Sequence, residues 1–245
     1  MTETETMRCP RCDHEQEESV ECRRCGLIFE RYRHAGARQP AQKSGMPRAR
    51  DELFLGAPAS TETLSLALRG LLLAVLILWG FTIMWATPAE TGEAPGFLHL
   101  VNTPFHEAGH ILFSPFGALV TSLGGSLGQI LMPLVCCLTL LLKTRDPFGA
   151  GVALWWLGQN FIDIAPYIND ARAGELMLLG GNTGQSSPYG FHDWEFILTE
   201  LGLQGWDHGI AWAAHLTGAA VMIIGLSWGA LVLRRHGQVL KAPKP

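Results

Sequence analysis

The chain has 245 residues, of which 48% are hydrophobic and only 16% carry a charge, and its formal net charge is -4. Soluble proteins carry a charge on roughly 25% of their residues, and the apolar residues of this chain gather in long runs after residue 63. The composition therefore predicts an all-α polytopic membrane protein with about four spans, and the net charge gives no support for a nucleic-acid partner.

The first 50 residues are polar and contain cysteine, without the apolar stretch of a signal peptide. We therefore expect the first apolar span to act as an uncleaved membrane anchor. The predicted organisation is a zinc ribbon at 1–30, a basic linker at 31–60, a membrane-embedded domain at 61–236 and a tail at 237–245.

Two C-x-x-C pairs lie near the amino terminus, Cys9 with Cys12 and Cys22 with Cys25. Nine residues separate the pairs, and this arrangement predicts a four-cysteine zinc site, with two disulfides or free thiols as the alternatives. The segment has few apolar residues, so bound metal would supply its stability. Thiolate ligands require a reducing compartment, which places this end in the cytoplasm. The segment resembles the short zinc-ribbon heads of many bacterial proteins, which implies that it stabilises the terminus or binds a cytoplasmic protein partner.

Basic residues dominate the predicted linker, which prolines and glycine interrupt. An arm that binds nucleic acid is one interpretation. The position just before a span favours another, in which the cations contact anionic lipid headgroups on the cytoplasmic side. The basic residues are Arg31, Arg33, Arg38, Lys43, Arg48 and Arg50.

Residues 64–86 form the first predicted span, because about 20 apolar residues in a helix cross a hydrocarbon core of about 30 Å. Arg69 lies near the start of this span, where its side chain can extend to the headgroups. The following loop, 87–96, contains acidic residues and no basic residue. This loop therefore suits the opposite side of the membrane.

The pattern H-E-x-x-H occurs at His106, Glu107 and His110, within the next apolar region. Residues four apart on a helix share a face, so the two imidazoles can bind one metal ion. Glu107 can then take a proton from a water molecule, which is the general-base role in metal-assisted hydrolysis. The alternative is that these side chains only form hydrogen bonds in a membrane bundle. The cost of ionisable groups in a bilayer argues against that alternative.

The helix that carries this pattern is predicted to be short. Thr103 suits its N-cap and Pro104 its first turn, and Pro115 should end it near Ser114. A helix of this length extends about 16 Å, which is too short for a core of about 30 Å. We therefore expect residues 98–122 to form a re-entrant element and not a full crossing.

Three further spans are predicted after this element. With four spans and a re-entrant element, all three clusters of basic residues fall on one side, whereas a fifth crossing would break this bias. We therefore expect a multi-pass protein of the inner cell membrane with both termini in the cytoplasm. The further spans are 123–142, 148–168 and 209–233, and the polar loop 171–208 should contain a short surface helix at 197–203.

A third metal ligand must come from another part of the chain. Asp170 is the first choice, because it ends a span on the outer side and because two histidines with one acid form a common ligand set in hydrolytic zinc sites. His192 is the alternative, and Asp163 and Asp193 are further candidates. An ion pair between Asp170 and Arg172 is the competing structural interpretation.

Two polar residues of the 148–168 span are expected to assist the site. Asp163 lies seven residues before Asp170, on nearly the same face of the helix, from which it can hold a ligand histidine by a hydrogen bond. Asn160 lies about one helical turn earlier, where it can hydrogen-bond the backbone of an extended substrate.

The chain resembles the site-2 protease family of intramembrane zinc metalloproteases over about residues 98–175. The resemblance depends on the sequence Phe-His-Glu-Ala-Gly-His at 105–110 and on the glycine-rich span that follows it. It also depends on Asn160, Pro166 and Asp170 in a later span.

This resemblance implies a catalytic zinc site. His106, His110 and Asp170 would bind the zinc ion, and Glu107 would activate the water. Asp170 lacks the glycine that follows the acid in the family, so His192 stays open as the third ligand.

The predicted function is a zinc-dependent, membrane-embedded peptidase that hydrolyses polypeptides in or beside the lipid bilayer, or a divergent and inactive relative of such enzymes. A non-catalytic protein is the alternative, in which the histidines bind metal for sensing or structure and the zinc ribbon docks a cytoplasmic partner. A hydrolase that acts on lipid with the same metal centre is a third interpretation.

Overall fold

The computed structural model divides the chain into two compact units, Met1–Arg48 and Ala49–Pro245. Most of the linker predicted at 31–60 lies outside the residues that the structure describes, as does the end of the predicted tail. The described residues are 6–17, 19–30, 49–56, 63–93 and 96–241.

The first unit contains a small antiparallel sheet, in which β1 (Thr6–Arg8) pairs with β2 (Glu15–Glu17). Its buried core consists of Cys9, Cys22 and Phe29. Folds of this size usually need disulfides or metal because their cores bury too little apolar surface.

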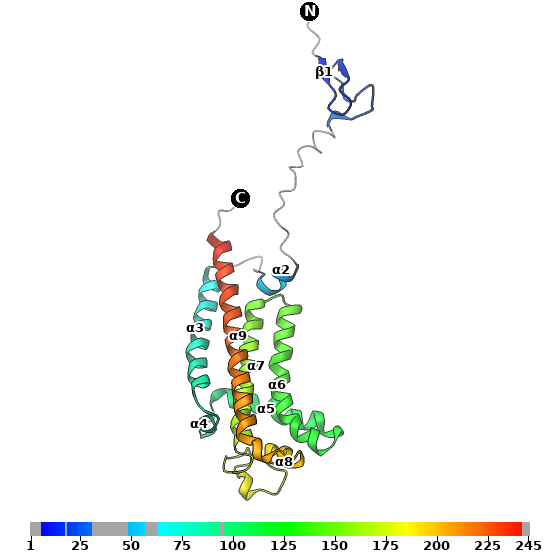
Figure 1. The fold of residues 1–245 in the computed structure, drawn as a ribbon. Helices are drawn as coiled ribbons and strands as arrows, with labels where there is room; N and C mark the ends of the chain where they lie inside the picture. Colours follow the sequence, from blue (N-terminus) through cyan, green and yellow to red (C-terminus); the bar gives the residue numbers. More distant parts are fainter. Residues whose placement is uncertain (1–5, 18, 31–48, 57–62, 94–95, 242–245) are drawn as a thin grey trace, which may run out of the picture. The chain divides into compact units, whose positions relative to one another are not determined.

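The second unit consists mostly of helices, which confirms the predicted helical fold (Figure 1). Short 3-10 turns follow α5 and precede α8 and α9. The helices are α2 (Ala49–Leu55), α3 (Thr63–Trp85), α4 (Pro88–Glu93), α5 (Phe97–Phe113), α6 (Ala118–Leu142), α7 (Pro147–Asn169), α8 (Asp193–Glu200) and α9 (Asp207–Lys241).

Among the described residues, three helical segments are long and apolar enough to cross a membrane. They are α3, α6 and the segment Gln204–Lys241 that includes α9, and they agree with three of the predicted spans. The predicted span at 148–168 forms the 23-residue helix α7, which is not among the three. Its polar side chains at Gln159, Asn160 and Asp163 make it less apolar than the others.

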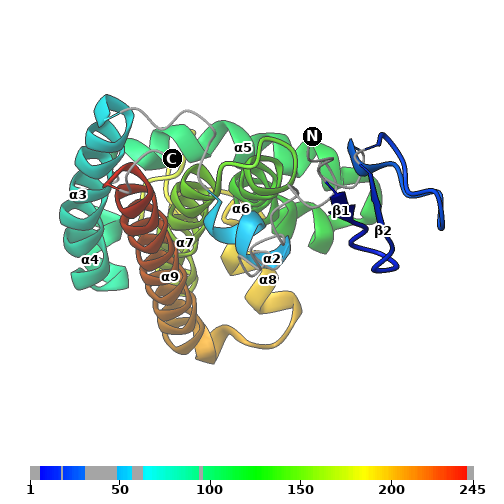
Figure 2. The same cartoon turned by 90° about the horizontal axis from the view of Figure 1, so that it is seen from above.

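The helix α7 is enclosed by other parts of the second unit. It packs against α9 and α6 (Figures 1 and 2), and most of its residues are buried. Gly158 and Gly218 permit the close contact with α9, because a Cβ atom on either would lie 2.5 Å from the carbonyl oxygen of the other. A helix enclosed in this way can carry polar residues that would be costly against lipid.

The helix α5 is longer than predicted. It begins at Phe97 and contains Pro104, so Thr103 is not its N-cap, and the Thr103 hydroxyl donates to the carbonyl oxygen of His99 at 2.7 Å. The predicted end is correct, because Pro115 lies in a 3-10 turn directly after the helix. With 17 residues, α5 extends about 26 Å.

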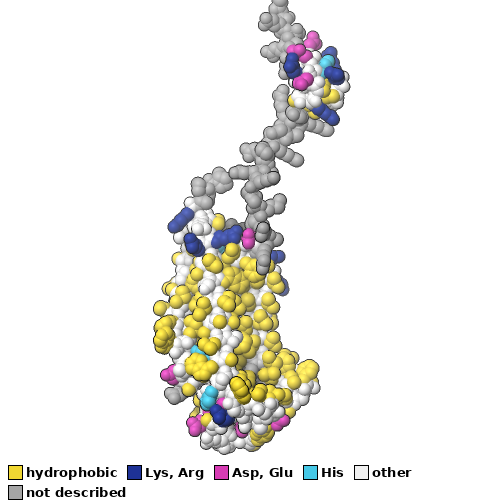
Figure 3. Space-filling model, viewed as in Figure 1, with side chains coloured by type: hydrophobic (Ala, Val, Ile, Leu, Met, Phe, Trp, Pro, Cys, Tyr) yellow, Lys and Arg dark blue, Asp and Glu magenta, His cyan; other side chains and the backbone are white. Residues whose placement is uncertain are grey.

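Positively and negatively charged side chains of the second unit lie mostly at opposite ends of it. In the view of Figure 3, apolar side chains cover the sides of this unit, most Lys and Arg side chains lie at one end, and most Asp and Glu side chains lie at the other. The carboxyl ends of α6 and α9 lie at the same end in Figure 1. Lys143 and Arg145 follow α6, and Arg234 and Arg235 belong to α9.

Candidate metal centre

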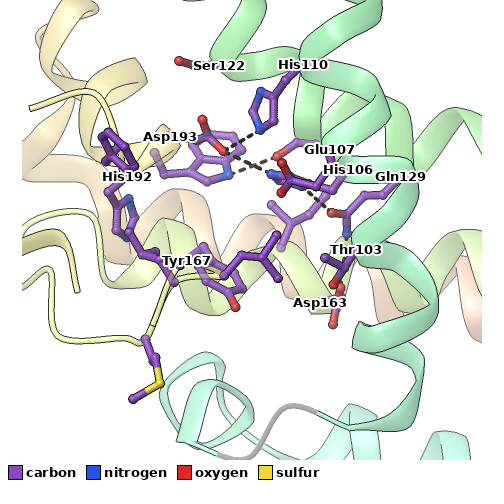
Figure 4. Close-up of a pocket in the computed structure, with 18 of the residues that line it drawn as sticks. Thr103, His106, Glu107, His110, Ser122, Gln129, Asp163, Tyr167, His192 and Asp193 are labelled. Carbon is purple, nitrogen blue, oxygen red and sulfur yellow. Dashed lines mark hydrogen bonds and ion pairs between the residues drawn. The ribbon is translucent and has the colours of Figure 1, made fainter. Parts of the chain in front are cut away.

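The two histidines of the H-E-x-x-H pattern point to one place in the structure. His106 and His110 lie one turn apart on α5, with 4.8 Å between their ring centroids. The Oδ2 atom of Asp193 lies 3.1 Å from Nε2 of His106 and 3.2 Å from Nε2 of His110 (Figure 4). Because Asp193 begins α8, the site joins two elements that are far apart in the sequence.

The other nitrogen of each imidazole contacts α6. Nδ1 of His110 lies 2.8 Å from the backbone carbonyl oxygen of Thr121, and Nδ1 of His106 lies 2.7 Å from Oε1 of Gln129. Both oxygens can only accept a hydrogen bond, so Nδ1 carries the proton in each ring. In the neutral imidazoles, each Nε2 therefore presents a lone pair toward Asp193.

Three electron-pair donors thus face one another, namely the two Nε2 atoms and Oδ2 of Asp193. In neutral rings none of the three carries a proton, so either an added proton on one ring or a bound cation must lie between them. Histidine nitrogen and carboxylate oxygen bind zinc at about 2.0–2.2 Å, and two such ligands at a tetrahedral angle lie about 3.3–3.6 Å apart. The observed separations of 3.1 and 3.2 Å are close to this value. The donor set therefore fits a divalent metal ion.

Glycine residues allow α6 to lie against the histidines. A Cβ atom on Gly125 would overlap Nε2 of His106 and would lie 2.6 Å from Nε2 of His110. A Cβ atom on Gly124 would lie 2.8 Å from the carbonyl oxygen of Gly109 on α5. Small residues let helices in membranes approach closely, and here they make room for the two rings.

Glu107 is exposed and lies beside the histidine pair. One of its carboxylate oxygens lies within 4.8 Å of a ring nitrogen of each histidine. These residues line a cavity of about 720 Å³, a volume in the range of small-molecule and cofactor sites. An acid therefore faces the same cavity as the candidate metal ligands, as the sequence predicts for a general base.

Asp170 and His192, the two predicted third ligands, contact each other and not the histidine pair. Oδ2 of Asp170 lies 3.4 Å from Nε2 of His192, and the Asp170 carboxylate accepts hydrogen bonds from two backbone N–H groups at 3.0 and 2.9 Å. Burial raises the pKa of this carboxyl, but His192 and the backbone N–H groups outweigh it and lower the pKa. Arg172, the alternative partner, pairs with Asp207 at 2.6 Å. The structure therefore brings Asp193 to the site in place of the two predicted ligands.

The start of α8 explains how Asp193 reaches the histidines. His192 is the N-cap, and its Nδ1 accepts a hydrogen bond from a backbone N–H of the first turn at 3.1 Å. Trp194 donates from Nε1 to Oγ of Ser126 on α6 at 3.2 Å. The helix predicted at 197–203 thus begins earlier, at Asp193. Acidic residues in a first helical turn are a known start signal, and this signal was available in the sequence.

Asp163 and Asn160 relate to the site in different ways. Asp163 does not contact a ligand histidine directly, because Gln129 lies between it and His106. Asn160 is fully buried, and its amide donates to the carbonyl oxygen of Trp156 at 2.9 Å. Asn160 does not line the cavity, so the structure does not place it at a substrate as predicted.

The cysteines of the first unit form a second group of potential metal ligands. Sγ of Cys9 lies 3.7 Å from Sγ of Cys25, and Sγ of Cys12 lies 3.6 Å from Sγ of Cys22. A disulfide requires about 2.05 Å, whereas thiolates around zinc at about 2.3 Å lie about 3.8 Å apart. Burial raises the pKa of the Cys22 thiol, but backbone N–H groups of Cys25 and Arg24 outweigh it and lower the pKa to about 6. The cluster therefore fits a metal ion better than two disulfides.

No protein-family model, curated protein or solved structure matches this chain. The geometry of the two clusters of potential metal ligands and the apolar helices are therefore the basis for the function proposed below.

Proposed function

We propose that this protein is a zinc-dependent, membrane-embedded peptidase that hydrolyses peptide bonds of membrane-associated polypeptides. The main support is the convergence of His106, His110 and Asp193 on one point of a cavity, with Glu107 beside them. Two histidines and one carboxylate are the ligand set of many hydrolytic zinc enzymes, in which a fourth position stays open for water.

A zinc ion held by these residues would supply Lewis acidity, which polarises a carbonyl group and lowers the pKa of a water molecule. The residues of the chain carry out the proton transfers and the positioning. Glu107 accepts a proton from the attacking water and passes it to the leaving amine. Contacts with the backbone carbonyl at position 121 and with the Gln129 side chain keep both Nε2 lone pairs directed at the site.

The walls of the cavity favour an apolar and extended substrate. The lining includes the apolar side chains of Ile164, Leu178, Phe191 and Trp194. Apolar side chains of a substrate would be stabilised here by removal from water. A membrane segment that unwinds at this site would leave its apolar side chains in such surroundings and expose one peptide bond to Glu107.

We also propose that the protein lies in the inner cell membrane with four spans and with both termini in the cytoplasm. The fourth span would be α7, whose polar residues avoid lipid because α6 and α9 pack against it. The element around α5 would be re-entrant. The support for this orientation is the basic residues that follow α6 and end α9, since such residues favour the cytoplasmic side.

Cleavage of a model membrane polypeptide by the full-length protein in liposomes tests the proposed reaction. Glu107→Gln should retain the metal and lose roughly 100-fold or more in rate, because a general base contributes about 10²–10⁴-fold. A matched control is Glu175→Gln, because Glu175 is also an exposed acid but does not line the cavity. Equal cleavage by the wild type and Glu107→Gln would exclude the proposed function.

The four-cysteine cluster supports a second candidate function, in which the protein is a scaffold without catalysis and the ribbon docks a cytoplasmic partner. Cobalt in place of zinc distinguishes the two candidates. A water molecule that exchanges at the histidine-bound ion supports the peptidase, since a catalytic site keeps an open position. A closed site with four protein ligands supports the scaffold.

A further inference from the structure

Gln129 connects the candidate metal centre to a buried acid. It lies on α6 and is only 4% exposed. Its Oε1 accepts a hydrogen bond from Nδ1 of His106 at 2.7 Å, and its Nε2 donates to Oδ2 of Asp163 at 3.2 Å (Figure 4). A carboxylate can only accept, so the second bond defines the orientation of the amide. The three side chains thus form a chain of hydrogen bonds that runs in one direction, from imidazole to carboxylate.

Asp163 is surrounded by donors and therefore has little freedom to move. Nδ2 of Asn102 donates to Oδ2 of Asp163 at 3.1 Å, and Nδ1 of His99 donates to its carboxylate at 3.2 Å. The Asp163 side chain is 11% exposed. A charge in such surroundings acts strongly on the groups that it contacts, because little water screens it. The Gln129 amide is one of those groups.

The two candidate ligand histidines are oriented by different means. His110 donates from Nδ1 to the backbone carbonyl oxygen of Thr121, which no side-chain substitution removes. His106 donates from Nδ1 to a side chain, which a substitution at position 129 removes. The chain therefore offers a matched pair of variants on one helix, of which only the one at position 129 is expected to weaken metal binding.

We propose that Gln129 is a positioning residue of the metal centre and that Asp163 acts on His106 through it. Gln129 holds the His106 ring in the tautomer with its lone pair on Nε2 and limits rotation of the ring. The Asp163 charge polarises the amide and so makes the imidazole a stronger donor to a metal ion. This role presupposes the metal centre of the proposed function, but it does not depend on the peptidase reaction.

Cobalt titration of the full-length protein against a competing chelator tests the role of Gln129. Cobalt bound by the four cysteines absorbs strongly through sulfur-to-metal charge transfer, whereas cobalt bound by nitrogen and oxygen gives only weak bands. The two sites are therefore measured separately, and the ribbon serves as an internal standard. Gln129→Met should weaken binding at the histidine site by roughly 10- to 100-fold, as loss of a hydrogen bond to a ligand does in other metal sites.

Two further variants make the test specific. Thr121→Val should leave the affinity unchanged, because it keeps the backbone carbonyl that holds His110. Asp163→Asn should weaken binding less than Gln129→Met, and should cause no further loss when Gln129 is already replaced, because the two residues act as one unit. Binding at the ribbon should stay the same in all variants.

Equal affinities of Gln129→Met and Thr121→Val for cobalt at the histidine site would overturn the role of Gln129. If Gln129→Met does not fold, Asp163→Asn tests the coupling alone, because it keeps the size and an acceptor oxygen, and an unchanged affinity would then overturn it. Absence of any cobalt outside the ribbon in the wild type would instead remove the metal centre of the proposed function.

Discussion

The two clusters of potential metal ligands in this protein are built in opposite ways. The cysteine cluster takes its ligands from a short stretch, since Cys9 and Cys25 are 16 positions apart, and its unit has a very small core. The histidine cluster combines α5 with Asp193, which is 87 positions from His106, in a unit with several helices in contact. Metal is thus expected to hold the first unit together, whereas the fold of the second unit holds the ligands. Under the proposed function, the same kind of ion would serve stability in one region and chemistry in the other.

Removal of metal should produce the largest difference between the two regions. A strong chelator, or Cys22→Ser, should unfold the ribbon, because structural zinc contributes about 10–16 kcal/mol in modules of this size. The helices of the second unit should remain, because they pack against one another without metal. Hydrogen exchange of the full-length protein measures both effects. Backbone amides of 6–30 that stay protected without metal would contradict this comparison.

Substitution of the acids should identify the third ligand. Asp193→Asn should weaken metal binding at the histidine site by roughly 100-fold or more. Loss of a hydrogen bond to a ligand can already cost this much, and the substitution removes a negatively charged ligand itself. Asp170→Asn should keep the affinity and make the 174–192 loop easier to cleave, because Asp170 holds the start of this loop. Chelator competition and limited proteolysis measure the two effects. Loss of metal in Asp170→Asn alone would support the sequence-based assignment of the ligand.

A methyl group added to α6 next to the two histidines should disturb the histidine cluster without unfolding the helices of the second unit. Gly125→Ala places a Cβ atom against both Nε2 atoms, and overpacking of this kind costs about 1–3 kcal/mol. We expect a lower zinc content per chain and a small decrease in thermal stability. Gly70→Ala is the control, because a Cβ atom at that position would meet nothing within 4 Å. Equal zinc contents of the two variants would show that the close contact of α6 is not needed.

The smallest expected effect concerns the pH dependence of the loop that leads to Asp193. The pKa of Asp170 is lowered in the folded protein, so its ionised form stabilises the loop above the unfolded value of about 3.9. This stabilisation should be lost as the pH falls from about 4 through the lower folded-state pKa. Digestion by an acid-active protease at a series of pH values from about 4 downward measures the opening of the loop. Asp170→Asn should remove the dependence of digestion on pH. A pH profile in this variant identical to that of the wild type would contradict the role of Asp170.

Much of the fold follows from the sequence, because long apolar runs are sufficient to place α3, α6 and α9. The start of α5 does not follow from local signals. Pro104 indicates a first turn, but the helix begins at Phe97. Contacts with α7 explain the longer helix, since Asn102 donates to Gln159 and accepts from Trp156. Tertiary contacts of this kind outweigh the local preference of a proline.

The sequence by itself determined the candidate ligands that lie within one local element. The spacing of the four cysteines and the one-turn separation of His106 and His110 are sufficient, because the geometry of a turn or a helix relates near neighbours directly. Only the tertiary structure decided which acid meets the histidines and that Gln129 orients one of them. Several acids lie on the same side of the unit, and the path of the loop between Asp170 and Asp193 selects among them. That path depends on contacts between distant residues, which no local pattern encodes.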